Sequence, residues 1–199
     1  VVEGLQGTAG QPGFLGPGHV LATAKHFIGD GGTKNGMDQG DTLVTEQELA
    51  AIHGAGYRGA LGAGAQTVMV SFSSWQGVKL HGHRYLLTDV LKGKLGFDGF
   101  IVSDWNGIGQ VSGCSNSACV PAVLAGIDMF MVPEDCKAFY TNLLASVGRG
   151  EVPVERINDA VRRILRVKAR LGLLDPAIAA QRHNNVTPSI VGQASHREL

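Results

Sequence analysis

The chain has 199 residues, which is enough for one substantial domain with a buried core. Hydrophobic residues make up 44% and charged residues 17%, as in an ordinary globular protein, and 17 basic residues balance 17 acidic ones. The formal net charge of zero excludes an overall attraction to nucleic acid or to an anionic membrane, and no apolar run is long enough to predict a transmembrane helix. A neutral partner such as a sugar is compatible with this charge.

The chain starts with Val1-Val2-Glu3-Gly4, which contains no initiator methionine and does not have the pattern of a signal peptide. We interpret this start as a cut inside a longer sequence. Any targeting region would then lie upstream of the first residue.

The first predicted element is a strand over residues 19–27, an apolar run too short for a confident helix. A helix is predicted next, because Thr45 and Glu48 have the spacing of a capping box. Its apolar residues at helical spacing are Leu49, Ile52, His53 and Tyr57.

Three further strands are predicted over residues 66–71, 99–104 and 128–132, each followed by a helical pattern. The first of these helices carries Leu86, Leu87, Val90 and Leu91 and ends at Gly96. The next two cover residues 118–125 and 138–147. A last helix begins near Pro153, closes at Gly172 and places Ile157, Val161, Ile164, Leu165 and Leu171 on one apolar face. The charged side chains between Glu151 and Arg170 are predicted to be its solvated face.

Strands that alternate with helices predict βα units and a parallel sheet. About four units are present, whereas a complete barrel has about eight in ~250 residues. The predicted fold class is therefore α/β, a TIM-type parallel (β/α) barrel of which residues 1–175 form the C-terminal half. After Asp175 the pattern stops, and residues 176–199, with a Thr-Pro-Ser turn, are predicted to be a linker toward a missing second domain.

Cys114 and Cys119 lie close together in a loop rich in Gly, Ser and Asn, and Cys136 is separate. The close pair is compatible with a small disulfide, which would indicate an oxidising compartment, and equally with two free thiols. Three cysteines without a nearby histidine do not complete a zinc site.

Polar and ionisable side chains follow each predicted strand. The active site of a barrel lies at the carboxyl ends of its strands, so these side chains are expected at one rim. They are Lys25, His26, Ser71, Asp104 and Glu134.

Asp104 directly follows the apolar run Phe100-Ile101-Val102, where a carboxylate is costly unless it is paired. A cation from a neighbouring strand, Lys25 or His26, would hold it ionised and suited to attack an electrophilic carbon. The alternative is a structural salt bridge at the rim.

Lys25 and His26 are donors suited to sugar hydroxyls, but a lysine here could also reach to solvent and a histidine cap a carbonyl. Lys25 could instead form a Schiff base, as in aldolase barrels. Trp75 and Trp105 follow strand ends and could stack on sugar rings, although a core position is favoured for Trp75. The glycine-rich residues 29–33 match no phosphate-binding loop and predict a tight turn.

At these strand ends the sequence resembles glycoside hydrolase family 3, most closely its β-glucosidase and exo-β-glucanase branch. The resemblance runs from about Gly4 to Asp175. Its matching stretches are KHFIGDGGT at residues 25–33, TVMVSFSSW at 67–75, GFIVSDW at 99–105, AGIDM at 125–129 and RINDAVRRIL at 156–165.

The resemblance implies that Asp104 is the nucleophile, which forms a glycosyl-enzyme intermediate. It also implies sugar-binding residues at five positions, two for hydroxyls, two lining the pocket and one on the acceptor side. In that order they are Lys25, His26, Met69, Phe72 and Trp105. Relatives can carry Tyr where Phe72 stands, so a hydroxyl contact is not expected there.

The branch that acts on N-acetylglucosamine carries a His-Asp dyad in the loop after the Lys-His pair, and residues 28–32 lack it. In the glucosidase branch the acid/base is a glutamate on a second domain, which this chain does not contain. The front half of the barrel is missing as well. No metal or organic cofactor is required.

The predicted function is retaining hydrolysis of terminal non-reducing β-D-glucosyl residues from β-glucosides or β-glucans, with this chain inactive alone. Its expected partners are that oligosaccharide, the missing half of the barrel and the second domain, in a secreted or periplasmic enzyme. The alternatives are a non-catalytic sugar-binding or structural half-barrel completed by another chain, and a Schiff-base lyase using Lys25.

Overall fold

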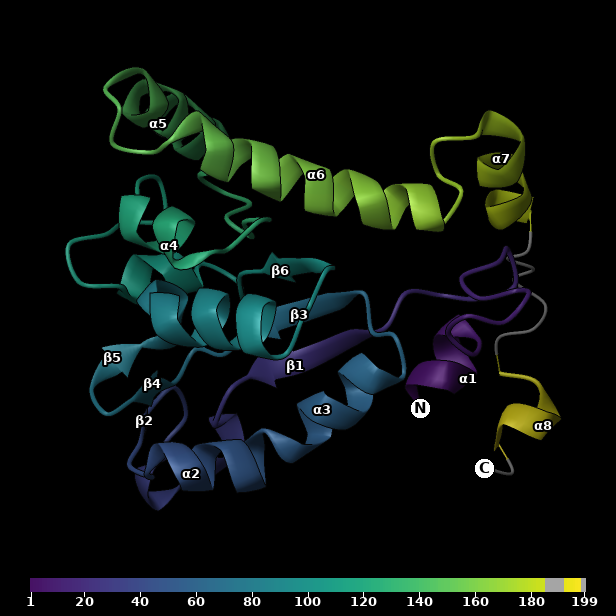
Figure 1. Cartoon of the computed structure of the whole chain (residues 1–199), viewed down its shortest axis with the longest axis horizontal. Helices are drawn as coiled ribbons and strands as arrows, with labels where there is room; N and C mark the ends of the chain where they lie inside the picture. The colour runs from purple at the N-terminus through teal and green to yellow at the C-terminus, as the bar shows by residue number, and fades with distance from the viewer. Residues whose placement is uncertain (185–191, 198–199) are drawn as a thin grey trace.

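A parallel three-stranded sheet forms the centre of the computed structural model, which describes residues 1–184 and 192–197 (Figure 1). Its strands are β1 (Thr23–Phe27), β3 (Thr67–Val70) and β6 (Phe100–Val102), in the order β1-β3-β6. Thr67 pairs with Thr23 on one side and with Phe100 on the other, and the register between β1 and β3 shifts between Ala24 and Phe27. The chain is α/β with a parallel sheet, as predicted.

The prediction of a fourth strand over residues 128–132 is wrong. Only Met129 continues the sheet, through a single parallel bridge to Val102. Beyond it, the Met131 N–H donates to the Ser103 side chain at 2.7 Å, and Pro133 has no N–H to donate. The segment stays beside the residues that follow β6, because the Met131 carbonyl accepts the Asn106 N–H at 2.9 Å, but it forms no regular ladder beyond Met129.

A second, smaller sheet is built from short strands that come after β1 and β3 in the chain. It consists of β2 (Asp41–Thr42), β4 (Ser74–Trp75) and β5 (Val78–Lys79), with β2 parallel and β5 antiparallel to β4. The short turns around it are η1 (Asp30–Gly32), η2 (Lys34–Gly36), η4 (Leu80–Gly82) and η6 (Gly107–Gln110). These turns lie among the segments that follow the strands of the main sheet.

The first long helical segment consists of α2 (Glu46–Glu48), η3 (Leu49–His53) and α3 (Ala55–Gly62). Its capping box is confirmed, because Thr45 and Glu48 exchange hydrogen bonds between side chain and backbone. The predicted continuous apolar face is wrong, since Ile52 is exposed. The cause is a π-helical turn, in which the Gly54 N–H donates to the Leu49 carbonyl and shifts the side chains around the axis.

The later helices follow the predicted order along the chain. They are η5 (Tyr85–Lys94), α4 (Val120–Ala125), α5 (Cys136–Gly148) and α6 (Val154–Arg170). The predicted leucines of η5 are buried, and Gly96 after it has a φ of 65°, which favours glycine. A short α1 (Val2–Gln6) opens the chain.

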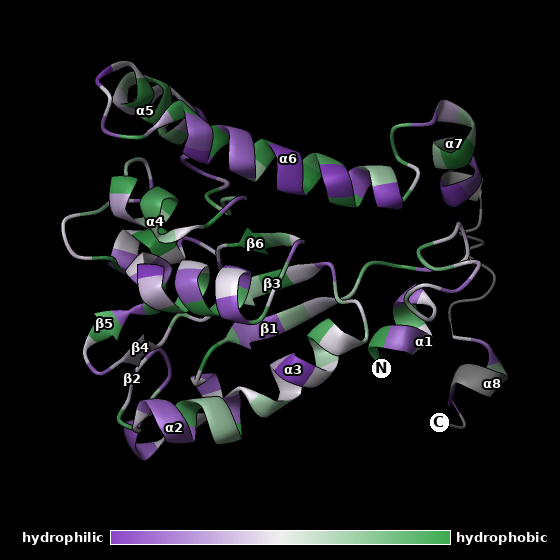
Figure 2. Cartoon of the chain, in the orientation of Figure 1, coloured by the Kyte–Doolittle hydropathy of each residue, from purple (hydrophilic) through white to green (hydrophobic). Residues whose placement is uncertain are grey.

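The predicted apolar face of α6 is confirmed in part, because Ile157, Ile164 and Leu171 pack against the core. Val161 and Leu165, expected in its buried face, are exposed, whereas Arg163 donates to the Phe97 and Gly99 carbonyls at 2.8 and 2.9 Å. The expected solvated face therefore contacts the segment leading into β6. Hydrophilic and hydrophobic bands lie side by side along α6 (Figure 2).

A buried ionic cluster explains this orientation. Asp128, whose side chain is inaccessible, pairs with Lys92 of η5 at 2.8 Å and with Arg156 of α6, and also accepts the Ile101 N–H at 2.8 Å. Asp159 of α6 pairs with the same two cations. The charges of α6 thus tie the helix to β6 and η5.

The residues expected to form a linker begin with a helix, α7 (Pro176–Asn184), and α8 (Ala194–Arg197) lies near the C-terminus. The Arg182 guanidinium donates to the carbonyls of Leu171 and His19, at 2.7 and 3.0 Å, and of Leu15. Helix α7 is therefore attached to the N-terminal segment through Arg182. The Thr-Pro-Ser turn lies outside the described residues.

The core has two parts. The larger packs η5 and α4 on one side of the sheet, with Leu87, Leu91 and Ile101 fully buried. The smaller packs Leu15 and the end of α6 against Phe100 and Val102. Among residues 1–184 and 192–197, no helix has the length and apolar character needed to cross a membrane.

Candidate active site

Asp104 stands at the first turn after β6, whose three apolar side chains are buried. Its carboxylate is 20% exposed, so it is neither sealed in the core nor freely solvated. Oδ1 accepts the Trp105 N–H at 2.7 Å, and Oδ2 lies 3.5 Å from Nε2 of His26. A backbone N–H and an imidazole thus face the two oxygens of the carboxylate.

His26, at the carboxyl half of β1, lies between two carboxylates. Its Nε2 faces Asp104, and its Nδ1 lies 3.4 Å from Oδ2 of Asp30 in η1. The other oxygen of Asp30 accepts the Ser71 hydroxyl at 3.4 Å, after β3. The predicted meeting of strand ends therefore takes place through side chains that follow or end β1, β3 and β6.

Lys25 does not pair with Asp104 in the described part of the chain, where the carboxylate pairs with His26 instead. Lys25 is exposed, and the peptide bond between it and His26 is cis. Of the two cations expected beside Asp104, the structure places only His26 there.

Glu134 is exposed and lies farther along the rim. Its Oε2 accepts the Asn106 side chain at 3.1 Å, and Asn106 follows Trp105 in the β6 turn. Glu134 is therefore connected to the turn after β6 through the Asn106 side chain. Among the residues that the structure describes, it shares no partner with the Asp104 carboxylate, which faces the Trp105 N–H and His26.

The aromatic residues separate into two groups. Trp105 is 52% exposed at the rim, whereas Trp75 is 8% exposed and its Nε1 donates to the Val44 carbonyl at 2.8 Å. The core position favoured for Trp75 is confirmed. Phe72 is half-buried with its ring centre 5.8 Å from that of His81, and Met69 is half-buried against the smaller part of the core.

The structure adds one residue that sequence reasoning missed, His81 in η4. Its ring is 1% exposed, and its Nε2 accepts the Asp104 N–H at 2.9 Å. Burial, followed by the charge of Lys79, lowers the pKa of His81 to about 3, against a hydrogen bond with the Ser71 backbone. With Nε2 as the acceptor, the neutral ring carries its proton on Nδ1. No apolar periodicity around His81 indicates its burial.

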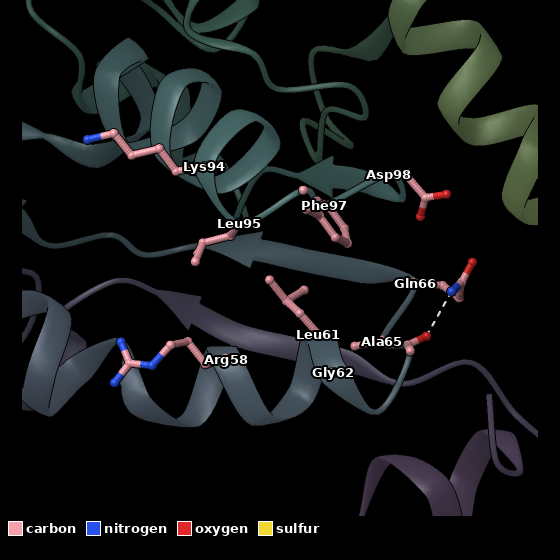
Figure 3. A pocket seen from close by; sticks show the side chains of 11 residues that line it. Arg58, Leu61, Gly62, Ala65, Gln66, Lys94, Leu95, Phe97 and Asp98 are labelled. Atoms are coloured by element: carbon pink, nitrogen blue, oxygen red, sulfur yellow. Dashed lines mark hydrogen bonds between the residues drawn. The ribbon is translucent and has the colours of Figure 1, made fainter. Parts of the chain in front are cut away.

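A surface pocket of about 410 Å³ lies at the opposite ends of the strands (Figure 3). Arg58 and Leu61 of α3 form one side, and Lys94, Phe97 and Asp98 lie across from them. Gln66, which precedes β3, and Asp98, which precedes β6, place it at the amino ends. None of the candidate site residues lines this pocket.

Cys114 and Cys119 form a disulfide with Cα atoms 4.8 Å apart, so the first of the two alternatives holds. Cys136 is an exposed free thiol. Within the described ranges, no three or more His, Cys, Asp or Glu side chains gather in a way that could hold a metal ion.

The fold and the site define a class: an α/β protein with an imidazole-paired carboxylate at the carboxyl end of a parallel sheet, as in barrel enzymes. Residues 1–167 match the family profile described as "Glycosyl hydrolase family 3 N terminal domain". The chain belongs to this family of glycoside hydrolases, and the resemblance seen in the sequence is confirmed.

Curated and solved relatives agree with this membership. The chain is 33% identical over 209 residues to a β-xylosidase of Formosa agariphila, of which it covers 28%, and 100% of the chain is aligned. It is 35% identical over 207 residues to a lysosomal β-glucosidase of Dictyostelium discoideum, with 99% of the chain and 25% of the relative covered. The crystal structure of an exo-1,3/1,4-β-glucanase from a Pseudoalteromonas species superposes with a TM-score of 0.94 at 49% identity, over 99% of this chain and 25% of that one.

Proposed function

We propose that this chain is the nucleophile-bearing C-terminal half of the catalytic barrel of a retaining β-glucosidase or exo-β-glucanase. The observation that carries this proposal is the position of Asp104 in this chain, which belongs to the glycoside hydrolase family. Its carboxylate follows strand β6 of the parallel sheet, with one oxygen on a backbone N–H and the other facing His26. The substrate would be a terminal non-reducing β-D-glucosyl residue of a glucoside or glucan.

The geometry suggests how the first step proceeds. Asp104 attacks the anomeric carbon, the bond to the leaving oxygen breaks, and a covalent glycosyl-enzyme forms. The leaving oxygen needs a proton from a second carboxyl group roughly 5–5.5 Å from the first, and that group later activates the water that releases the sugar. We assign this acid/base to the second domain.

The remaining candidates would hold the sugar. Exposed Lys25 and half-buried His26 are hydroxyl donors, and half-buried Met69 and Phe72 offer pocket walls. Trp105, exposed at the rim, offers a ring face on the acceptor side. Such contacts accelerate the reaction to the extent that they strengthen in the transition state.

The barrel half is supported by the strand order and by coverage. The sheet stops at β1 on one side and at the single Met129 bridge on the other, where a front half would continue it. The chain spans about a quarter of the relatives' length. We assign residues 1–175 to the half-barrel and 176–199 to the connection with the second domain.

The disulfide supports an exported enzyme, because such bonds persist in oxidising compartments. Relatives named as a periplasmic and a lysosomal β-glucosidase agree with a secreted or periplasmic location.

One other substrate has an observation in its favour, since the Formosa relative is named a β-xylosidase. A xyloside lacks the hydroxymethyl group of a glucoside but has the same reacting centre. A Schiff-base lyase is not favoured, because Lys25 is exposed, whereas a Schiff-base lysine is commonly desolvated or beside another cation.

The test is a paired hydrolysis by the full-length enzyme, followed by NMR of the first-formed sugar. Aryl β-glucoside and aryl β-xyloside are compared at equal concentration. We expect faster release from the glucoside, with the β-anomer formed first. First formation of the α-anomer would contradict a retaining nucleophile, and faster release from the xyloside would change the substrate and leave Asp104 in its role.

A further inference from the structure

The pairing between β3 and β6 ends just before the two strands deliver their site residues. The last register pair joins Met69 to Val102. Two residues farther on, the strands are no longer bonded to each other directly. The Nε2 of His81 accepts the Asp104 N–H at 2.9 Å there, and the Ser71 backbone acts on the same imidazole.

His81 is held in this position by two close neighbours. The Phe72 ring lies with its centre 5.8 Å away, and Gly107 approaches so closely that a β-carbon there would lie 2.4 Å from ring atoms Cε1 and Nε2. The ring is 1% exposed, so water does not compete for its two nitrogens. A flexible side chain would not fix the backbone in this way.

The same turn also fixes the Asp104 carboxylate. The Asp104 carbonyl accepts the Gly107 N–H at 3.1 Å, and its Oδ1 accepts the Trp105 N–H at 2.7 Å. The backbone from Asp104 to Gly107 therefore determines where the carboxylate stands. The bond to His81 anchors the start of that turn to the neighbouring strand.

We propose that His81 is a positioning residue for the attack step, which fixes the Asp104 backbone through Nε2 and thereby aligns the carboxylate with the anomeric carbon. This inference rests on the proposed function of Asp104. His81 touches neither sugar nor leaving group. Its effect comes from alignment, and a misplacement of about 1 Å in an active site costs about 100-fold in rate.

The test measures the attack step alone in the full-length enzyme. A 2-deoxy-2-fluoro-β-glucoside with a dinitrophenyl leaving group traps the glycosyl-enzyme and needs little acid help, so its inactivation rate reports the attack of Asp104. Competitive inhibition by glucose reports the shape of the sugar pocket. Positioning predicts a slower attack with unchanged glucose affinity.

Two variants of His81 separate the effect of its hydrogen-bond acceptor, Nε2, from the effect of its side-chain size. His81→Met keeps an apolar side chain of similar size without the nitrogen acceptor, and we expect inactivation about 100-fold slower with glucose inhibition unchanged. His81→Gln can present its Oε1 where Nε2 stood, and we expect at least about a tenfold recovery. The matched control is His83→Gln in the same loop, where His83 stacks near Trp75 and should leave the inactivation rate unchanged.

If His81→Met does not fold, Gly107→Ala tests the same contact from the other side, because its β-carbon pushes on the imidazole. We expect it too to slow inactivation while leaving glucose inhibition unchanged. A normal rate in folded His81→Met or Gly107→Ala overturns the inference, as does His81→Gln no faster than His81→Met. A wild-type enzyme that the reagent does not label at Asp104 overturns the proposed function itself.

Discussion

At the scale of single residues, Asp104 combines three contacts that each act on a different atom. Its N–H is bound by His81, one oxygen by a backbone N–H and the other by the imidazole of His26. Together they hold the carboxylate at a fixed place. Placing a carboxylate at a partly buried position costs free energy unless partners compensate it. We therefore interpret these partners as a sign of function.

Asp104→Asn should abolish turnover and leave the fold intact. The amide has nearly the shape of the carboxylate but is a poor nucleophile. We expect kcat/KM to fall on the order of 1,000-fold or more in the full-length enzyme, with an unchanged circular dichroism spectrum. Near-normal hydrolysis by the variant would remove Asp104 from the mechanism.

His81 should make the protein sensitive to acid. Burial lowers the pKa of His81 to about 3, whereas an exposed histidine in the unfolded chain has a pKa of about 6.5. Below about pH 6.5 the unfolded state therefore binds a proton that the folded state does not, and the free energy of unfolding falls as the pH drops toward 3. The slope from this one group is at most about 1.4 kcal/mol per pH unit.

The non-titrating His81→Gln should lose this part of the pH dependence. Urea unfolding of wild type and variant at about pH 4.5 and pH 7 measures it. We expect the stability difference between the two pH values to be smaller in the variant. Equal pH dependence in both proteins would show that His81 is not held neutral.

At the scale of elements, buried charge pairs orient α6 together with the apolar residues that it packs against the core. Arg156 faces the sheet because the buried Asp128 side chain pairs with it, and Arg163 donates to carbonyls that precede β6. The outward side of the helix then carries Val154, Val161 and Leu165. An amphipathic pattern alone does not reveal which of its two faces is buried.

Asp128→Asn should destabilise the protein strongly. The substitution leaves Lys92 and Arg156 buried beside a neutral amide, and breaking a buried pair by removing one partner costs about 3–5 kcal/mol. The matched control is Asp159→Asn, whose side chain is 39% exposed, so solvent compensates the cations. We expect thermal unfolding to show the larger loss at Asp128, and equal losses would contradict the buried cluster.

The sequence predicts well where local rules are sufficient. Apolar runs with following polar residues located β1, β3, β6 and the meeting of His26 with Asp104, because the ends of neighbouring parallel strands lie at one rim. The prediction of a strand around Met129 was wrong, because the next backbone donor, the Met131 N–H, bonds to the side chain of Ser103, which is remote in sequence. His81 was missed for the same reason: its burial and its two partners depend on segments remote in sequence.

At the scale of the whole molecule, the described residues leave sheet edges and apolar side chains at the surface. Within the described residues, the main sheet ends at β1 on one side and at the single Met129 bridge on the other. Large apolar side chains are exposed on α5 and α6. They are Tyr140, Leu144, Val154, Val161 and Leu165. Open edges and apolar surface of this kind favour association with other chains.

The 199-residue chain by itself should not hydrolyse disaccharides. It lacks the front wall of the proposed pocket and the assigned acid/base, and general acid help is worth roughly 100- to 10,000-fold. Incubation with cellobiose or laminaribiose should give no glucose, and a dinitrophenyl β-glucoside, which needs less acid help, at most a trace. The full-length enzyme is the control. Steady glucose release from a disaccharide would place the acid within this chain, with Glu134 or Asp30 as the first candidates.

The identity of the nucleophile is tested most directly by trapping it. The full-length enzyme is inactivated with the dinitrophenyl 2-deoxy-2-fluoro-β-glucoside, digested, and mapped by mass spectrometry with fragmentation of the labelled peptide. We predict one fluoroglucosyl group in ester linkage to the carboxylate of Asp104, and protection by glucose. A label on another carboxylate, such as Asp30 or Glu134, would contradict the assignment.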